Sequence, residues 1–139
     1  MARYRFKAEK NLSRQFRDFS IGMKANPNTE DFSIVKNENA IKQAMKNLLL
    51  TQFGERPFQP NLGSGLRDVL FEPLDYGTAA LIKKSIREVI STYEPRIRVQ
   101  NIRTRLDSAN NGYDVSLQYS IVGREDKAVG VEFFLERTR

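Results

Sequence analysis

Few side chains in this sequence are suited to acid–base or nucleophilic chemistry. The chain has neither cysteine nor histidine, which excludes disulfides, thiolate nucleophiles, a Ser-His-Asp triad and zinc sites of the usual nitrogen and sulfur type. Carboxylates remain, and two stand close to arginine: Glu94 in the run Glu94-Pro95-Arg96, and Glu55 directly before Arg56. A guanidinium beside a carboxylate favours an ion pair over a proton donor. We therefore expect no catalysis, no metal and no cofactor.

The positive charge of the chain is concentrated at its start. The net charge is +6, and the first 24 residues carry seven basic and two acidic side chains, which is +5 of that total. Such a basic arm suits an acidic protein surface or nucleic acid, or it is a solvated tail. The nearly neutral remainder has no nucleic-acid-binding motif, which argues against nucleic acid. Interleaved aromatic residues favour docking on the domain or a partner: Tyr4, Phe6, Phe16 and Phe19.

Length and composition fit one globular domain. A chain of 139 residues with 40% apolar and 29% charged side chains can bury one hydrophobic core. No run approaches the roughly 20 apolar residues of a membrane span, and the charged start lacks the apolar stretch of a secretory signal. We expect a basic N-terminal arm over 1–36, with one extended piece at Phe32–Val35, and a single domain over 37–139.

Two amphipathic helices are predicted to carry the domain. The first begins at Asn37, a good N-cap, and shows one apolar face until Gly54 ends it. The second runs from Thr78, its expected cap, to Tyr93, where Pro95 stops it.

The segment between these helices combines proline and glycine with large apolar residues. A flexible linker would be polar, so we expect an ordered, buried loop that ends in a short helix near Leu66–Leu70. Its charged pair would satisfy backbone groups, with partner contact as the less favoured alternative. The predicted anchors are Phe58, Leu62, Leu66, Leu70 and Phe71. The residues predicted to shape the loop are Gly54, Glu55, Arg56, Pro57, Phe58, Pro60, Gly63 and Gly65.

Beyond Pro95 the apolar period changes from 3.6 to 2. Three strands follow, with a bulge near Gln100–Asn101 and turns at 108–112 and 123–127. Short connections favour an antiparallel meander. The predicted fold is therefore α+β: two main helices and a short helix packed on a three-stranded antiparallel β-meander, preceded by the arm.

The loop pattern G-E-R-P-F-Q-P-x-x-G-S-G-L at Gly54–Leu66, the L-F-E-P run at Leu70–Pro73 and the tripeptide at Glu94–Arg96 occur in one order and spacing. From about Ile41 to Ile97 the chain thereby resembles the baseplate wedge and sheath-initiator family of contractile-tailed phages, which has type VI secretion counterparts. The first 36 residues match no motif of that family.

The resemblance implies a structural role in the tail baseplate of a virion assembled in the host cytoplasm. It implies several copies around the tail axis, in contact with other wedge proteins, the tail sheath protein and the tail tube. It also implies a sheet edge on which sheath strands add by β-augmentation. The strand predicted to offer that edge contains Val129, Val131, Phe133 and Leu135. Without the resemblance, an ordinary edge strand shielded by the chain's own tail would be favoured.

The tripeptide Glu94-Pro95-Arg96 has two interpretations. The resemblance favours a rigid polar contact with another wedge protein, in which Pro95 fixes the exit from the helix and Arg96 presents its planar fork. The alternative is a helix stop followed by an internal salt bridge, which contributes little if exposed.

The family also carries a lysozyme label, so a peptidoglycan glycosidase is the alternative function, beside a type VI secretion subunit. Glycoside hydrolysis usually needs two carboxyl groups about 5–9.5 Å apart, one with a raised pKa. The candidates are Glu55, Glu72 and Glu94. Two of them lie close to arginine, which lowers a carboxyl pKa, so we expect a non-enzymatic protein.

Overall fold

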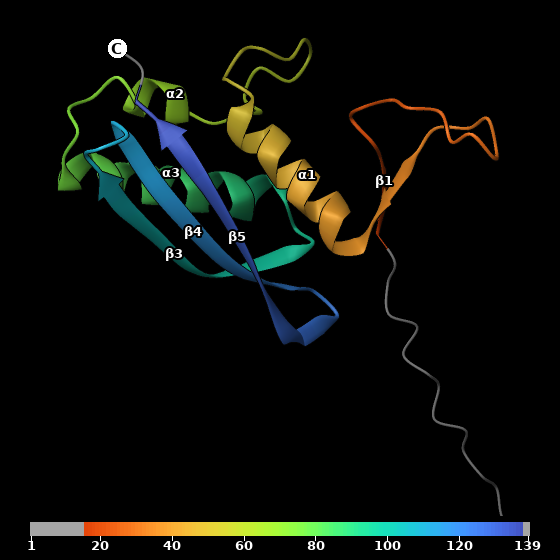
Figure 1. Ribbon diagram of the computed structural model, residues 1–139. Helices are drawn as coiled ribbons and strands as arrows, with labels where there is room; N and C mark the ends of the chain where they lie inside the picture. The colour runs from red at the N-terminus through yellow and green to blue at the C-terminus, as the bar shows by residue number, and fades with distance from the viewer. Residues whose placement is uncertain (1–15, 138–139) are drawn as a thin grey trace, which may run out of the picture.

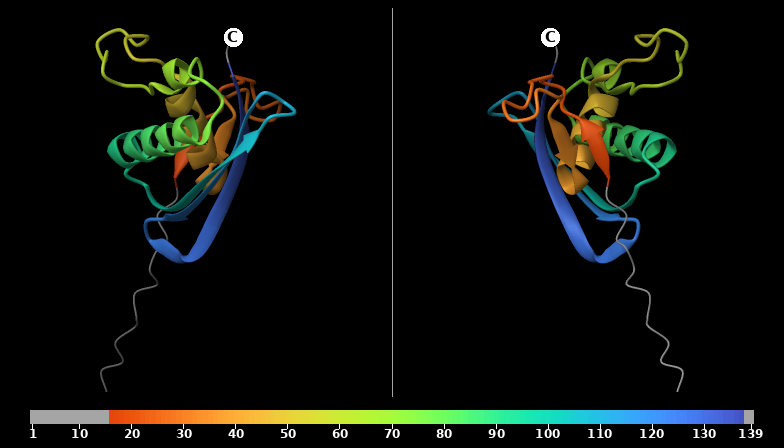
Figure 2. Two further views of the ribbon diagram at one scale, coloured as in Figure 1. Left: turned by 90° about the vertical axis from the view of Figure 1, so that its left-hand side faces the viewer. Right: turned by 90° about the vertical axis from the view of Figure 1, so that its right-hand side faces the viewer.

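The computed structural model describes residues 16–137 and has the predicted α+β architecture. Three helices cover one face of a three-stranded antiparallel sheet with strand order β3-β4-β5, so the body has two layers (Figures 1 and 2). A two-stranded antiparallel hairpin precedes the body. The elements are β1 (Arg17–Phe19), β2 (Ile34–Lys36), α1 (Asn37–Leu50), α2 (Leu66–Val69), α3 (Tyr76–Tyr93), β3 (Ile97–Asp107), β4 (Gly112–Ile121) and β5 (Arg124–Glu136).

The core lies between α3 and the inner face of the sheet. Alternate residues of β4 point inward, as the period of 2 predicts, and the helix contributes one apolar stripe. The Thr104 hydroxyl on β3 donates to the Ala79 carbonyl on α3 at 3.1 Å, which joins the two layers. The fully buried side chains of this core include Ile82, Ile86, Ile90, Val115, Leu117 and Tyr119.

The strand pairing confirms the predicted bulge and corrects one turn. The β3–β4 register shifts between Val99 and Asn101, where the apolar phase of the sequence changes. The third strand begins at Arg124, earlier than the expected turn over 123–127 allows. Gly123 has a φ of +89°, a left-handed conformation that permits a tight reversal and lets pairing resume at once.

Helix ends differ from the sequence prediction because other groups satisfy the terminal backbone. Asn37 is the first residue of α1, with a φ of +52°, and its N–H donates to the Phe16 carbonyl at 2.8 Å. The helix ends at Leu50, where both donors of Thr51 reach the Asn47 carbonyl, so Gly54 is a loop residue. In α3 the cap is Asp75, not Thr78: its carboxylate accepts the Thr78 N–H at 2.7 Å.

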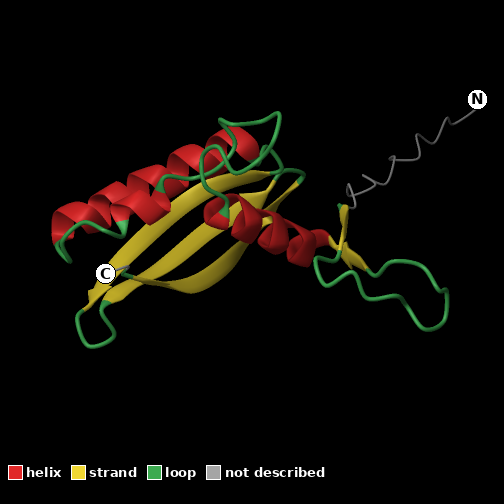
Figure 3. Ribbon diagram, turned by 90° about the horizontal axis from the view of Figure 1, so that it is seen from above, coloured by secondary structure: helices red, strands yellow, loops and turns green. Residues whose placement is uncertain are grey.

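The described part of the arm forms a hairpin where the sequence predicted only one extended piece. Phe19 pairs with Ile34, and the hairpin extends beyond the start of α1 (Figure 3). The ring of Phe19 meets that of Phe32 edge to face at 6.3 Å, and both rings are largely exposed. Tyr4 and Phe6 lie outside the described residues. Across residues 16–137, the helices are too short or too polar to span a membrane.

Candidate functional site

The chain turns sharply at Pro95, between α3 and β3, and there forms an internal ion pair. Glu94 is 3% exposed, and its two carboxylate oxygens accept from Arg96 Nε and Nη2 at 2.6 Å each. The planar guanidinium therefore binds the carboxylate through two parallel hydrogen bonds. The internal salt bridge that was the alternative interpretation of the tripeptide is therefore present, with a buried carboxylate.

Arg96 also connects this corner to the arm. Its Nη1 donates to Asp18 Oδ2 on β1 at 3.0 Å, and its guanidinium carbon lies 5.7 Å from the centre of the Phe16 ring. The hydrogen bonds from Arg96 to Glu94, and secondarily to Asp18, raise the pKa of Arg96 above its ordinary value. The accessible parts of the tripeptide are Pro95 and about a quarter of the Arg96 side chain. Contact with a partner at this corner remains a prediction.

Strand β5 is an edge strand, and it pairs with β4 alone among the described strands. The Arg137 N–H donates to the Asn111 carbonyl beside β4 at 3.0 Å. Because successive backbone groups of a strand point to opposite edges, the backbone of Phe133 and Leu135 faces β4. The groups that face the free edge belong to the residues between them, such as Glu132 and Phe134.

The four β5 residues singled out from the sequence lie on this edge strand, and their contact with a partner remains a prediction. Their side chains point toward the helices: Val129 is buried, and Val131, Phe133 and Leu135 are half-buried against the core. These side chains hold the strand against the core, whereas the backbone groups of the even-numbered residues between them face the free edge of the sheet. The alternation of apolar and polar residues gives the inward face, but no sequence signal tells which backbone groups face β4.

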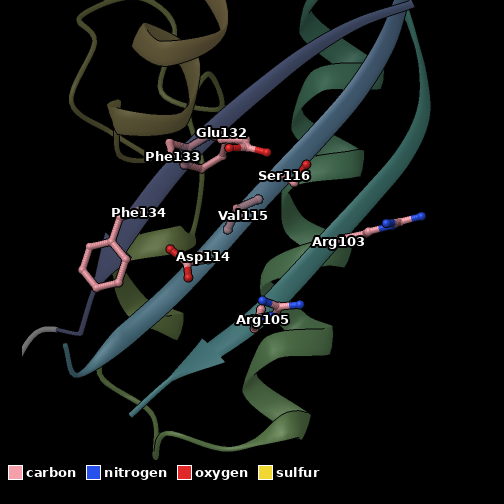
Figure 4. A pocket seen from close by; sticks show the side chains of 8 residues that line it. All are labelled: Arg103, Arg105, Asp114, Val115, Ser116, Glu132, Phe133 and Phe134. Carbon is pink, nitrogen blue, oxygen red and sulfur yellow. The ribbon is translucent and has the colours of Figure 1, made fainter. Parts of the chain in front are cut away.

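The sheet face opposite the helices is polar and slightly hollowed. A shallow depression of about 580 Å³ lies across its three strands. Figure 4 shows Arg103 and Arg105 on β3, Asp114 on β4, and Glu132 and Phe134 on β5 around it. These residues are not among those predicted from the sequence to form a site, although they alternate with the inward apolar ones and are recognisable from that period.

The loop after α1 is anchored at its ends rather than by its phenylalanines. Leu66 and Leu70 are buried, as predicted, whereas Phe58 is fully exposed and Phe71 is half exposed, so the prediction of a buried loop anchored by these two phenylalanines is wrong. The fixed point is Ser64, whose hydroxyl donates to the Leu49 carbonyl at 2.6 Å and whose N–H donates to the Thr51 carbonyl at 2.8 Å.

The charged pair of this loop behaves partly as expected. Glu55 accepts the Gln52 N–H at 2.8 Å and so satisfies a backbone group, whereas Arg56 is exposed. The proline-rich tip, residues 53–61, is exposed, and its contact with a partner remains a prediction.

The candidate carboxylates are in unlike environments. Glu94 is engaged by Arg96, while Glu55 and Glu72 are exposed. Among the side chains that the structure describes, no three acidic groups gather as a metal site would require. The described acids therefore do not include a pair composed of a buried proton donor and a second free carboxylate.

Comparisons with known proteins agree with this architecture. The family model for baseplate wedge protein gp25 matches residues 35–126. Baseplate wedge protein gp25 of Enterobacteria phage T4 is 33% identical over 87 residues, which are 63% of this chain. The match spans 65% of the T4 protein, so the chain covers slightly less than two thirds of that relative's length.

Three solved structures share the fold. A Geobacter sulfurreducens protein named for a tail lysozyme matches with a TM-score of 0.66, 21% identity, and coverage of 73% of this chain and 92% of that one. A chain of the anti-feeding prophage baseplate matches with a TM-score of 0.63 and 19% identity, and the match covers 90% of this chain and 88% of that one. A chain of the contracted pyocin R2 baseplate matches with a TM-score of 0.57 and 20% identity, and covers 70% of this chain and 96% of that one. Since the family model covers most of the chain, the protein belongs to the gp25 baseplate wedge protein family.

Proposed function

We propose that this protein is a structural component of the baseplate wedge in a contractile tail and that it nucleates the sheath. In this mechanism the free edge of β5 accepts a strand from a sheath subunit, which extends the three-stranded sheet. The observation that carries the proposal is the row of outward-facing backbone groups on β5, next to Glu132 and Phe134, in a member of this family. Unpaired edge groups are the usual acceptors of an added strand.

The proposed partners follow from this position. Other wedge proteins would hold the body, sheath subunits would add to β5, and the tail tube would lie nearby, with several copies around the tail axis. The proposed location is the tail baseplate of the virion, after assembly in the host cytoplasm. Relatives come from phage T4, the anti-feeding prophage and pyocin R2, so the proposal extends to related contractile particles.

The corner at Glu94-Pro95-Arg96 is proposed as the contact with another wedge protein. Its exposed part is Pro95 together with the outer portion of Arg96, while Glu94 holds the guanidinium from inside. Because Arg96 also binds Asp18, this contact would include the base of the hairpin. The basic arm is proposed to dock on a baseplate or tube partner through the charge of residues 1–24.

A non-catalytic role is part of the proposal. The buried acid Glu94 is bound by an arginine, and the two other candidate acids lie in water. Purified protein incubated with peptidoglycan is expected to release no reducing ends. Release that disappears in Glu94→Gln would establish a glycosidase and overturn this part.

Hydrogen exchange on assembled baseplates tests the sheath proposal. Amides of Glu132 and Phe134 are expected to exchange quickly in baseplates alone and at least tenfold more slowly after sheath protein is added. Amides of Phe133 and Leu135 face β4 and serve as internal controls, since they are protected in both states. Unchanged exchange at Glu132 and Phe134 in sheathed particles would refute strand addition at β5.

A further inference from the structure

A basic groove lies along β3, the edge strand on the opposite side of the sheet from β5. It has a volume of about 530 Å³ and is formed by this strand together with the first turns of α3. Lys83, Arg103 and Arg105 are exposed and place three cations around it, and none of the described residues that line it is acidic. The other lining residues are Tyr76, Asn101, Ile102, Thr104 and Leu106.

The cations of this groove are not neutralised within the domain. Among the side chains that the structure describes, Lys83, Arg103 and Arg105 form no ion pair, although Asp114 on β4 lies opposite Arg105. Figure 4 shows Arg103 pointing away from β4. Tyr76 stands beside these groups and is 86% exposed. Arginine and tyrosine are enriched in protein interfaces, so the composition of the groove suits a protein partner that carries carboxylates.

The backbone of β3 has a free edge along this groove, since β3 pairs with β4 alone among the described strands. In the register of the sheet, Arg103 lies opposite Ser116 and Arg105 lies opposite Asp114. Val115, whose partner on β5 faces β4, turns its own backbone groups toward β5, so Asp114 and Ser116 turn theirs toward β3. The backbone groups of Arg103 and Arg105 therefore face β4. The groups that face the free edge belong to Ile102, Thr104 and Leu106.

The two edges of the sheet differ in charge. A strand added to β3 would have Arg103 and Arg105 beside the side chains of its outer face and Lys83 beside those on the helix side. A strand added to β5 would instead have Glu132 and Glu136 beside its outer face. Opposite charges on neighbouring strands attract and like charges repel, so acidic strands are favoured at β3 and disfavoured at β5.

We infer that the β3 edge is a second site of strand addition and that its partner is an acidic, extended segment of another protein. The free backbone groups of β3 pair with the added strand by β-augmentation, which gives affinity without regard to sequence. Lys83, Arg103 and Arg105 bind its carboxylates and so select an acidic segment. This site lies on a different edge from that of the proposed function and does not depend on it.

The charge of the groove also argues against two other occupants. Residues 1–15 of the chain itself carry five basic side chains and one acidic side chain, so their charge has the same sign as that of the groove. Nucleic acid has the right charge, but it lacks the alternating peptide N–H and C=O groups that pair with a strand edge.

Labelled peptides test this inference by fluorescence anisotropy on the full chain. The acidic peptide Thr-Glu-Val-Glu-Val-Glu-Thr is expected to bind at least tenfold more tightly than its version with Lys for Glu. Added salt should reduce that difference, because the cations of the groove are exposed. A thymidine tetranucleotide carries the same three negative charges and should bind more weakly than the acidic peptide. Equal binding of the two peptides, or tighter binding of the tetranucleotide, would overturn the inference.

Charge-reversed proteins show whether the peptide is at this groove. Lys83→Glu/Arg103→Glu should weaken binding of the acidic peptide about tenfold, as expected for two exposed pairs. Lys42→Glu/Lys46→Glu on α1 changes the net charge by the same amount and is the matched control, which should leave binding unchanged. Equal weakening in both variants would show a response to net charge alone and would overturn the inference. Self-association of the native protein that the acidic peptide reverses would also overturn it, because the occupant would then be a second copy of the chain.

Hydrogen exchange with saturating acidic peptide identifies the edge that is used. The amides of Thr104 and Leu106 should exchange at least tenfold more slowly when the peptide is bound, while those of Arg103 and Arg105, which face β4, serve as internal controls. Unchanged exchange at Thr104 and Leu106, or slowing on β5 instead, would refute strand addition at β3. The test of sheath nucleation is read on β5, so either proposal can fail while the other holds.

Discussion

Arg96 Nη1 lies 3.0 Å from Asp18 Oδ2, which joins residues 78 positions apart in the chain. The same guanidinium holds the buried Glu94 carboxylate with two bonds of 2.6 Å. One side chain therefore fixes the corner between α3 and β3 and also the base of the N-terminal hairpin. The tripeptide therefore links two segments of the molecule itself, independently of any partner.

Arg96→Ala is expected to lower the free energy of unfolding by about 2–3 kcal/mol, because it leaves a buried carboxylate without its cation. Chemical denaturation of the purified chain measures this change. Asp18→Asn removes only the contact to the hairpin, between partly exposed groups, and should cost less than about 1 kcal/mol. Equal stability of Arg96→Ala and the native protein would show that the corner does not depend on the ion pair.

Glu132→Pro is expected to stop sheath nucleation while leaving the fold intact. The Glu132 N–H faces the free edge, so proline removes a donor that the isolated chain does not pair with β4. Sheath polymerisation on baseplates, followed by electron microscopy, reads out the effect. Glu132→Ala keeps the N–H and should nucleate normally, whereas Phe133→Pro should unfold the β4–β5 pairing. Normal sheaths on Glu132→Pro baseplates would contradict the role of this edge.

Gly63→Ala should destabilise the loop more than Gly54→Ala. Both glycines have positive φ, but a Cβ at Gly63 would approach the Gln52 carbonyl carbon and oxygen to 2.7 Å. A Cβ at Gly54 meets nothing within 4 Å, so only its left-handed conformation is penalised. We expect losses of about 2–3 and about 1 kcal/mol in denaturant titrations. The reverse order would show that the contact at Gln52 relaxes freely.

The cap of α3 gives stability that depends on acid pH. The hydrogen bond from the Thr78 N–H holds the pKa of Asp75 below its ordinary value near 3.8. The stabilising contribution of the ionised cap is present above that ordinary value and is lost as the pH falls through the lowered pKa. Native protein should therefore melt above Asp75→Asn at pH 6, with the gap closing below pH 4. A gap that stays constant over this range would exclude the ionised cap as its cause.

Tyr119→Phe is expected to leave stability unchanged or to raise it by up to about 1 kcal/mol. The Tyr119 hydroxyl is buried without a hydrogen-bond partner in the described residues, and burial raises the pKa of Tyr119 to about 12. Tyr113→Phe is the matched control, because the Tyr113 hydroxyl accepts the Asp75 N–H at 3.1 Å. That control should cost about 1 kcal/mol in the same unfolding measurement. A larger loss in Tyr119→Phe than in Tyr113→Phe would reverse this assignment.

The sequence by itself determined the elements that depend on local periodicity. The stripe of Ile82, Ile86 and Ile90 predicts α3, and the change of apolar phase near Gln100–Asn101 predicts the bulge that the β3–β4 register contains. The motifs at Gly54–Leu66 and Glu94–Arg96 also indicated the family, which the comparisons then showed. These features are encoded by residues that are close together in the chain, so the amino-acid sequence is enough to find them.

Only the tertiary structure decided which groups are satisfied within the chain and which face outward. The ion pair of Arg96 with Asp18 depends on two distant segments meeting, and the outward backbone of Glu132 depends on how β5 pairs with β4. The exposure of Phe58 likewise follows from the loop path and not from its apolar side chain. Such features arise from long-range packing and strand phase, which residue types and spacing do not specify.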